Sequence, residues 1–172
     1  VAKNDHAHQR LTKQFADRSL SRTYQAVVWG VPIPWQGTVD APIGRHVRDR
    51  KKMAVTAKGG KAAITHYRVV KEMEHVAVVE CKLATGRTHQ IRVHMAHLKH
   101  PVVGDQTYGA RKGGGAADKD KAVALLRAFP RQALHAIKLE FIHPRTNRRV
   151  SFSSPLPDDI TSLIKALARL EK

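Results

Sequence analysis

A strand that ends at a glycine and leads directly into a helix is the feature that most constrains this chain, and it lies within residues 83–109. A β-branched run stops at Gly86, and a helical pattern of apolar residues follows from Thr88 to Lys99. The N-terminus of such a helix attracts anions through its free N–H groups. Arg87 and Arg92 add positive charge there. The stretch therefore predicts an anion-binding strand–helix junction.

Strand-like segments outnumber helical ones along the rest of the chain, and several follow each other as hairpins. Expected strands span residues 22–30, 61–71, 75–84, 133–142 and 148–153, and expected helices span residues 4–17, 88–99 and the segment from residue 157 onward. This pattern is typical of an α+β fold with a mixed, mainly antiparallel sheet and flanking helices. The length of 172 residues fits a single domain over residues 1–172.

The side chains of the first expected strand, residues 22–30, fall on two opposite faces. Side chains alternate along a strand, so Arg22, Tyr24 and Ala26 share one face. Val27 and Trp29 share the other face.

The charge of the chain points to a polyanionic partner. Lys and Arg number 31 against 14 Asp and Glu, which gives a net charge of +17. Solubility does not require so large an excess, because self-repulsion destabilises a compact state. Nucleic acid is the usual partner of such a protein. The basic run at residues 45–52 is a candidate phosphate-binding loop, through Arg45, Arg48, Arg50, Lys51 and Lys52.

Several other kinds of site are disfavoured by the residues. His89, His94 and His97 are spaced poorly for a metal, and no cysteine or glutamate joins them. Cys81 is the only cysteine and reads as a buried strand residue. The glycine-rich stretch at residues 110–121 is expected to be a surface loop, because it lacks the features of a P-loop. We expect no metal, no cofactor and no membrane span.

Arg92 stands out within the expected helix. Its neighbours Ile91 and Val93 are apolar, which indicates partial burial. A buried arginine requires a carboxylate or a phosphate. No acid lies in register on this helix, so the partner is expected to come from elsewhere.

The stretch LATGRTHQIRVHMAHLKHPVVGDQTYG resembles the signature of the RluA-type RNA pseudouridine synthases. The resemblance extends to RTYQAVVWG, to GKAAITHYRVV before the signature, and to RQALHAIKLEFIHP with SPLPDD near the C-terminus. It covers essentially the whole chain.

The resemblance implies isomerisation of uridine to pseudouridine in RNA, with ribosomal RNA as the expected substrate. Family members flip the uridine out of its stack and use a catalytic aspartate. Tyr24 matches the family's active-site tyrosine, and Arg92 matches the basic residue that pairs with the aspartate. Leu134 matches an apolar residue of the pocket. Arg87 and His89 join the basic run as expected RNA contacts.

The aspartate itself is not found in this chain, because the family carries it in an HRLD motif that would precede Val1. Asp5 reads instead as a cap of the first helix, a position that Asn4 can also take. We expect the chain to be the C-terminal part of a catalytic domain, inactive by itself. A non-catalytic RNA-binding domain that lost the acid is the alternative, and a DNA-binding protein would share the charge. A monomer in a reducing cytosol is expected. The target uridine is not identified by the sequence.

Overall fold

The computed structural model describes residues 1–109 and 120–171, and these residues form the expected α+β fold. The elements in chain order are α1 (Asp5–Ala16), β1 (Ser21–Trp29), β2 (Gln36–Asp40), β3 (Ile43–Arg45), β4 (Met53–Val55), β5 (Ile64–Glu72), β6 (Val76–Leu83), α2 (Gln90–His97), α3 (Lys121–Ala128), β7 (Leu134–Ile142), β8 (Arg149–Ser153) and α4 (Asp158–Leu170). Within the described ranges, no helix is long and apolar enough to cross a membrane.

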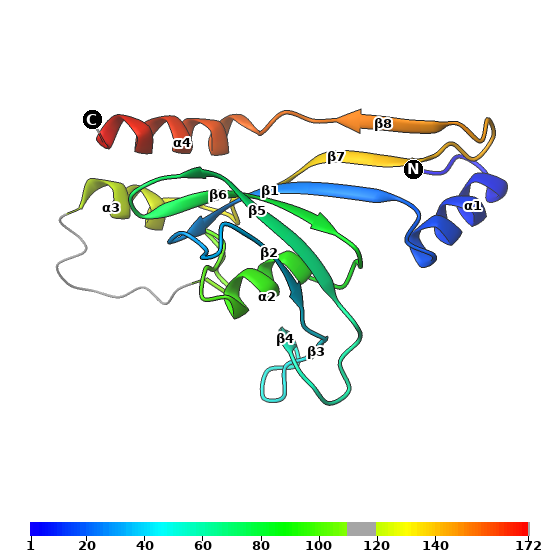
Figure 1. Ribbon diagram of the computed structural model, residues 1–172, viewed down its shortest axis with the longest axis horizontal. Coiled ribbons are helices and arrows are strands. Elements are labelled where there is room, and N and C mark those ends of the chain that lie inside the picture. Colours follow the sequence, from blue (N-terminus) through cyan, green and yellow to red (C-terminus); the bar gives the residue numbers. More distant parts are fainter. Residues whose placement is uncertain (110–119, 172) are drawn as a thin grey trace.

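A six-stranded sheet organises the fold, in the order β2-β5-β6-β1-β7-β8. Every neighbouring pair in this sheet is antiparallel. Strands β3 and β4 form a separate hairpin. Figure 1 shows α2 beneath the sheet, the β3–β4 hairpin projecting beyond α2, and α4 on the opposite side.

The two faces of the sheet carry separate cores, as the alternation in the first strand predicts. Ala26 and Val28 pack with Ile91 and Met95 of α2. On the other face Val27 joins a cluster formed by α3 and α4. Burial of apolar side chains on both faces is the main stabilising force for this arrangement.

The predicted strands and long helices are confirmed within one to three residues at their ends, whereas short elements were missed. Strands β2, β3 and β4 have three to five residues each, too short for an alternating pattern to stand out. Helix α3 was also missed. Its first residue, Lys121, is the last residue of the stretch expected to be a glycine-rich surface loop. The rest of that expected loop, residues 110–119, lies outside the described residues.

Of the two expected helix caps, the first is taken by Asn4, one of its two candidates, and the second differs from expectation. The side chain of Asn4, and not that of Asp5, accepts the hydrogen bond from the Ala7 N–H at the start of α1. Helix α2 begins after His89 rather than Thr88, and His89 has left-handed backbone geometry with φ of 57° and no side-chain cap. The start of α2 must therefore be held by other contacts.

The buried side chain of Gln90 supplies those contacts. Its Oε1 accepts hydrogen bonds from the Thr85 hydroxyl at 2.7 Å and from the Arg87 N–H at 2.9 Å. Its Nε2 donates to the Ile64 carbonyl and to the Thr65 hydroxyl, both at 2.9 Å. An amide has two donors and two acceptor positions. All four are used, so the residue joins the start of α2 to the start of β5.

The fully buried His94 extends this network one turn further along α2. Its Nε2 lies 2.9 Å from the Ala41 carbonyl, which can only accept, so Nε2 carries the proton. Its Nδ1 lies 2.9 Å from the Thr65 hydroxyl and accepts the hydroxyl proton. Burial lowers the pKa of His94 below its ordinary value, which outweighs the opposing effect of the Ala41 carbonyl.

The lowered pKa of His94 predicts a pH-dependent stability. The unfolded chain binds the proton more readily, so the contribution of His94 is complete above about pH 6.5 and is lost as the pH falls toward the folded-state pKa. We expect His94→Gln to lower the free energy of unfolding at neutral pH, by a deficit that shrinks on acidification. The slope of this change is at most about 1.36 kcal/mol per pH unit. Urea unfolding of both proteins between about pH 5 and about pH 8 measures it. A deficit that stays constant across this range would contradict the assignment.

Candidate active site

Arg92 of α2 forms a bidentate ion pair with Asp105. The distances are 2.7 Å from Nε to Oδ2 and 2.8 Å from Nη2 to Oδ1. The Asp105 side chain is 0% exposed and that of Arg92 is 13% exposed. The acid comes from outside the helix, as expected, but this partner lies within the chain and is not the family's catalytic aspartate. Asp105 lies in the turn that follows the helix, where the chain folds back onto α2, so the pattern of the helix alone does not indicate this partner.

Asp105 is held ionised by its surroundings. Burial alone would raise the pKa of its carboxyl group, but hydrogen bonds from Arg92 and from the N–H groups of Tyr108 and Thr107 outweigh this effect. The pKa of Asp105 therefore lies below its ordinary value. The same ion pair raises the pKa of Arg92. The pair is a fixed element of the structure at every physiological pH.

Tyr108 connects this ion pair to the β3–β4 hairpin. The Arg92 guanidinium carbon lies 4.8 Å from the centroid of the Tyr108 ring, a distance typical of a cation–π contact. The Tyr108 hydroxyl accepts a hydrogen bond from the Met53 N–H and lies 2.9 Å from His89 Nδ1. Burial and the charge of Arg92 lower the pKa of His89. A neutral ring that carries its proton on Nε2 can accept the hydroxyl proton at Nδ1.

Tyr24 and Leu134 lie on the face of the sheet that α2 covers. Tyr24 is paired with Cys81 of β6 and with Ala136 of β7, and Leu134 is paired with Ala26. Both side chains are partly buried against the core beneath α2. The structure thus brings the face with Tyr24 and Leu134 together with the helix that carries Arg92. Their roles in catalysis remain predictions.

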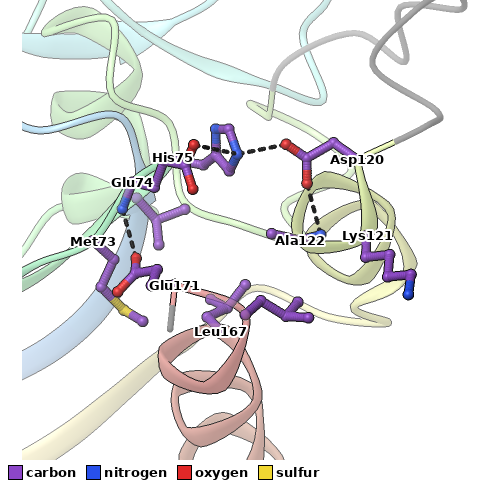
Figure 2. A pocket seen from close by; sticks show the side chains of 10 residues that line it. Met73, Glu74, His75, Asp120, Lys121, Ala122, Leu167 and Glu171 are labelled. Carbon is purple, nitrogen blue, oxygen red and sulfur yellow. Dashed lines mark hydrogen bonds and ion pairs between the residues drawn. The ribbon is translucent and has the colours of Figure 1, made fainter.

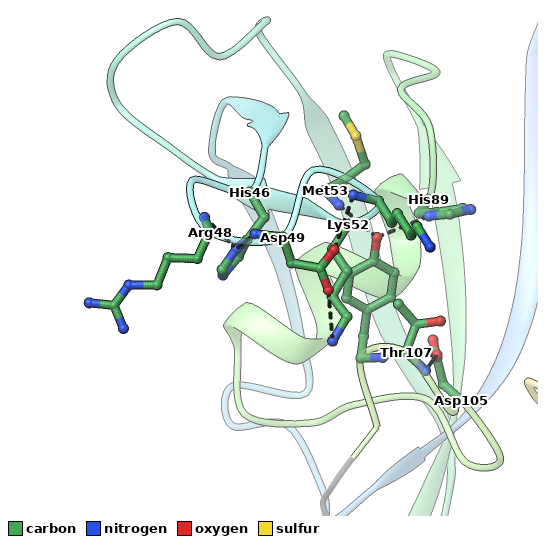
Figure 3. A network of polar contacts seen from close by, with 10 residues as sticks. His46, Arg48, Asp49, Lys52, Met53, His89, Asp105 and Thr107 are labelled. Atoms are coloured by element: carbon green, nitrogen blue, oxygen red, sulfur yellow. Dashed lines mark hydrogen bonds and ion pairs between the residues drawn. The ribbon is translucent and has the colours of Figure 1, made fainter.

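The basic run forms the loop between β3 and β4. His46 organises this loop, because its Nδ1 accepts hydrogen bonds from the Arg48 and Asp49 N–H groups. Arg45 donates to the Arg50 carbonyl at 2.9 Å. Figure 3 shows the Arg48 side chain extending away from the loop and the Lys52–Asp49 contact within it. Of the five basic residues, Arg45, Arg48, Arg50 and Lys51 are exposed.

The two other expected RNA contacts lie just before α2. Arg87 is partly buried, and its Nε donates to the Ala62 carbonyl at 3.0 Å. His89 is exposed but is joined to Tyr108. The structure places both beside the β3–β4 hairpin, while contact with RNA remains a prediction for each of them.

Two cavities are lined by residues other than Tyr24, Arg92 and Leu134. One, of about 930 Å³, lies between Asp105, Trp29 and helix α3. The other, of about 300 Å³, lies between the β5–β6 turn, α3 and the end of α4. Two contacts cross the rim of this second cavity (Figure 2). His75 Nε2 lies 2.7 Å from Asp120 Oδ2, and the Glu74 N–H donates to the Glu171 carboxylate. Neither cavity supplies the group of residues expected to act on a base.

Cys81 is buried as expected, and the neighbouring Tyr67 is buried as well. The Tyr67 hydroxyl donates to the Pro34 carbonyl. Burial raises the pKa of the Cys81 thiol to about 12, so it is not a nucleophile at neutral pH.

Chemically, the face of the sheet beneath α2, together with Arg92 of that helix, combines an aromatic ring for stacking, an oriented guanidinium and an apolar wall. Sequence reasoning missed Asp105 and Tyr108 as parts of this arrangement. Both stand in the PVVGDQTYG segment that closes the signature, and that position was the available signal.

Comparison with known proteins identifies the family. The family model described as RNA pseudouridylate synthase matches residues 1–97, which is more than half of the 172 residues. The chain belongs to this family. The RluA-type resemblance found in residues 83–109 is thereby confirmed.

Relatives match over nearly the whole chain. Ribosomal large subunit pseudouridine synthase D of Pseudomonas aeruginosa is 50% identical over 167 residues, which are 97% of this chain and 52% of that protein. The uncharacterized RNA pseudouridine synthase YlyB of Bacillus subtilis is 46% identical over 169 residues, 98% of this chain and 51% of that protein. The chain thus spans about half the length of these curated relatives.

A solved structure shows the same fold. The chain titled Human RNA Pseudouridylate Synthase Domain Containing 1 superposes with a TM-score of 0.71 at 28% sequence identity. The match covers 98% of this chain and 74% of the human one. The α+β assignment is confirmed by this similarity.

The Arg92–Asp105 pair predicts a large loss of stability when one partner is removed. Asp105→Ala leaves a mostly buried guanidinium unpaired, which costs about 3 to 5 kcal/mol. Asp159→Ala is the matched control, because Asp159 forms a bidentate pair with Arg131 at 2.7 Å whose side chains are each 39% exposed. We expect a much smaller loss there. Denaturant unfolding measures both variants, and equal losses would contradict the importance of burial.

Proposed function

We propose that the protein containing this chain isomerises uridine to pseudouridine in RNA, with ribosomal RNA of the large subunit as its substrate. The observation that carries the proposal is the match to pseudouridine synthase relatives over nearly the whole chain. The position of Tyr24 and Leu134 on the sheet face beneath the helix that carries Arg92 supports it. The net charge of +17 supports a nucleic-acid substrate. The names of the Pseudomonas aeruginosa and related proteins support ribosomal RNA.

In this proposal the target base leaves its stack and packs against Tyr24, with Leu134 as part of the apolar wall. Aromatic side chains commonly stack on bases that have been turned out of RNA. The catalytic aspartate is the one that the family carries in its HRLD motif. No metal or cofactor takes part.

Arg92 would hold that aspartate ionised. Asp105 occupies Nε and Nη2 of the guanidinium, while Nη1 has no hydrogen-bond partner in the described part of the chain. Nη1 is therefore the donor that remains for a second carboxylate. A charged donor at this place lowers the pKa of the carboxyl group that it meets. Asp105 acts as the residue that orients Arg92.

The β3–β4 loop would contact the phosphates of the RNA outside the site. Its exposed residues Arg45, Arg48, Arg50 and Lys51 are carried on a loop whose shape is fixed by His46. We further propose that the protein is a monomer that acts in the cytoplasm.

The direct test uses the full-length protein, including the segment before Val1. Large-subunit ribosomal RNA that lacks the modification is incubated with it, and pseudouridine is detected by chemical labelling and primer extension. Conversion of one or a few uridines is expected. If the full-length protein binds RNA but leaves every uridine unchanged, it is a binding protein and the proposal fails.

Arg92→Met in the full-length protein is expected to abolish turnover while most RNA affinity remains. The substitution removes the donor for the catalytic carboxylate but no exposed phosphate contact. Single-turnover rates and RNA dissociation constants measure the two effects separately. The unfolding transition is recorded as well, because Arg92 also pairs with Asp105. Equal losses of rate and of affinity would show that Arg92 is only a phosphate contact.

The β3–β4 loop should contribute to affinity in a salt-dependent manner. Each phosphate contact that is lost lowers the slope of log K against log salt by about 0.7 to 0.9. We expect Arg48→Gln with Arg50→Gln to show this reduction for both residues, with the rate at saturating RNA little changed. Lys165→Gln with Arg169→Gln on α4 is the control of equal charge. An unchanged slope in the loop variant would exclude the loop from the RNA interface.

A further inference from the structure

Arg22 is a partly buried cation on the same strand as Tyr24. The register of β1 with β6 is regular from Thr23 to Trp29, and the shift against β7 between Thr23 and Tyr24 comes from one extra residue in β7. Side chains along β1 therefore alternate, and Arg22 shares the Tyr24 face, where its guanidinium lies against Gly86 of the strand–helix junction. Two residues along a strand span about 7 Å. The Arg22 guanidinium carbon lies 5.5 Å from the centroid of the Phe15 ring of α1.

Arg22 has no acidic partner in residues 1–109 and 120–171. Its Nε is buried and lacks a hydrogen-bond partner, and no ion pair joins its terminal nitrogens to any described carboxylate. A buried guanidinium nitrogen without a partner is costly. Arg92, by contrast, already has Asp105. Arg22 is therefore the arginine on this face whose partner is missing.

Gly86 leaves the space in which the Arg22 guanidinium lies. A Cβ atom at residue 86 would be 2.5 Å from Nη1, 2.6 Å from Nη2 and 3.0 Å from the guanidinium carbon. The strand–helix junction therefore touches Arg22 through its smallest residue. Arg22 therefore lies between Tyr24 and Gly86, at the edge of the proposed base pocket.

We propose that Arg22 binds a backbone phosphate of the RNA beside the nucleotide whose base stacks on Tyr24; this inference rests on the proposed function. The planar fork of an arginine matches phosphate oxygens. The net charge of +17 favours an RNA phosphate over a protein carboxylate. A carboxylate from the segment before Val1 already has a donor in Arg92 Nη1. Arg22 thus positions the nucleotide by its backbone, while Tyr24 holds its base.

The test measures RNA affinity of the full-length protein at several salt concentrations. Arg22→Gln should weaken binding roughly tenfold and lower the salt slope by about 0.7 to 0.9. Arg22→Lys should keep the slope, because the charge remains. Arg169→Gln is the control: Arg169 is exposed at the end of α4, and its loss should leave the slope unchanged.

Gly86→Ala provides an independent variant that leaves the charge intact. The added methyl group displaces the flexible end of Arg22 and no backbone atom, so the fold should be kept. It should weaken binding in the wild-type background. The same substitution should have little effect when Arg22 is already Gln, because the two residues then no longer interact.

Three results would overturn the inference. In the first, Arg22→Gln leaves the salt slope of RNA binding unchanged but abolishes the rate of uridine conversion. Arg22 would then pair with a protein carboxylate and not with a phosphate. Another is additive effects of Gly86→Ala and Arg22→Gln on binding. The third is an equal slope change for Arg169→Gln. Failure of the proposed function is recognised separately, because then the wild-type protein itself leaves uridine unchanged, whatever its salt slope.

Discussion

The four hydrogen bonds of the Gln90 amide determine where α2 begins, and the rest of the site depends on this position. Helix α2 has no side-chain cap, so Gln90 replaces it by joining the junction to Ile64 and Thr65 of β5. Each buried polar group that lost its partner would cost about 1 to 3 kcal/mol. With the first turn of α2 fixed in this way, Arg92 lies one half-turn further on and meets Asp105.

Arg92 and Arg22 are both arginines near the proposed base pocket, but they differ in their partners. Arg92 is paired with Asp105, which belongs to the same signature stretch. Asp105 orients the guanidinium and leaves one of its nitrogens available. Arg22 has the aromatic ring of Phe15 but no acid in the described chain. Burial without an acid partner, rather than charge alone, is what distinguishes an anion-binding arginine from one that supports the structure.

The sequence was sufficient for the elements whose patterns are long. Strand β1 and its two faces, the β5–β6 hairpin and α2 followed from alternation and helical periodicity. The family followed from the segment that includes Gly86 and Arg92. The partner of Arg92 could not be predicted, because Asp105 approaches it through a turn whose path is set by tertiary packing. Strand β3 and strand β4 are too short to show a period, and their pairing depends on contacts with α2.

The hydrogen bonds of the Tyr108 hydroxyl group couple the β3–β4 hairpin to α2. The hydroxyl joins the Met53 N–H of the hairpin to His89 at the start of α2, so the hairpin and the helix cannot move independently without breaking a hydrogen bond. Two binding events that share such an element are linked reciprocally. A ligand that holds the hairpin in this position would raise the affinity for a ligand beside α2 by some factor. A ligand bound beside α2 would raise the affinity of the hairpin for its own ligand by the same factor. The two ends of the surface would then act as one recognition unit.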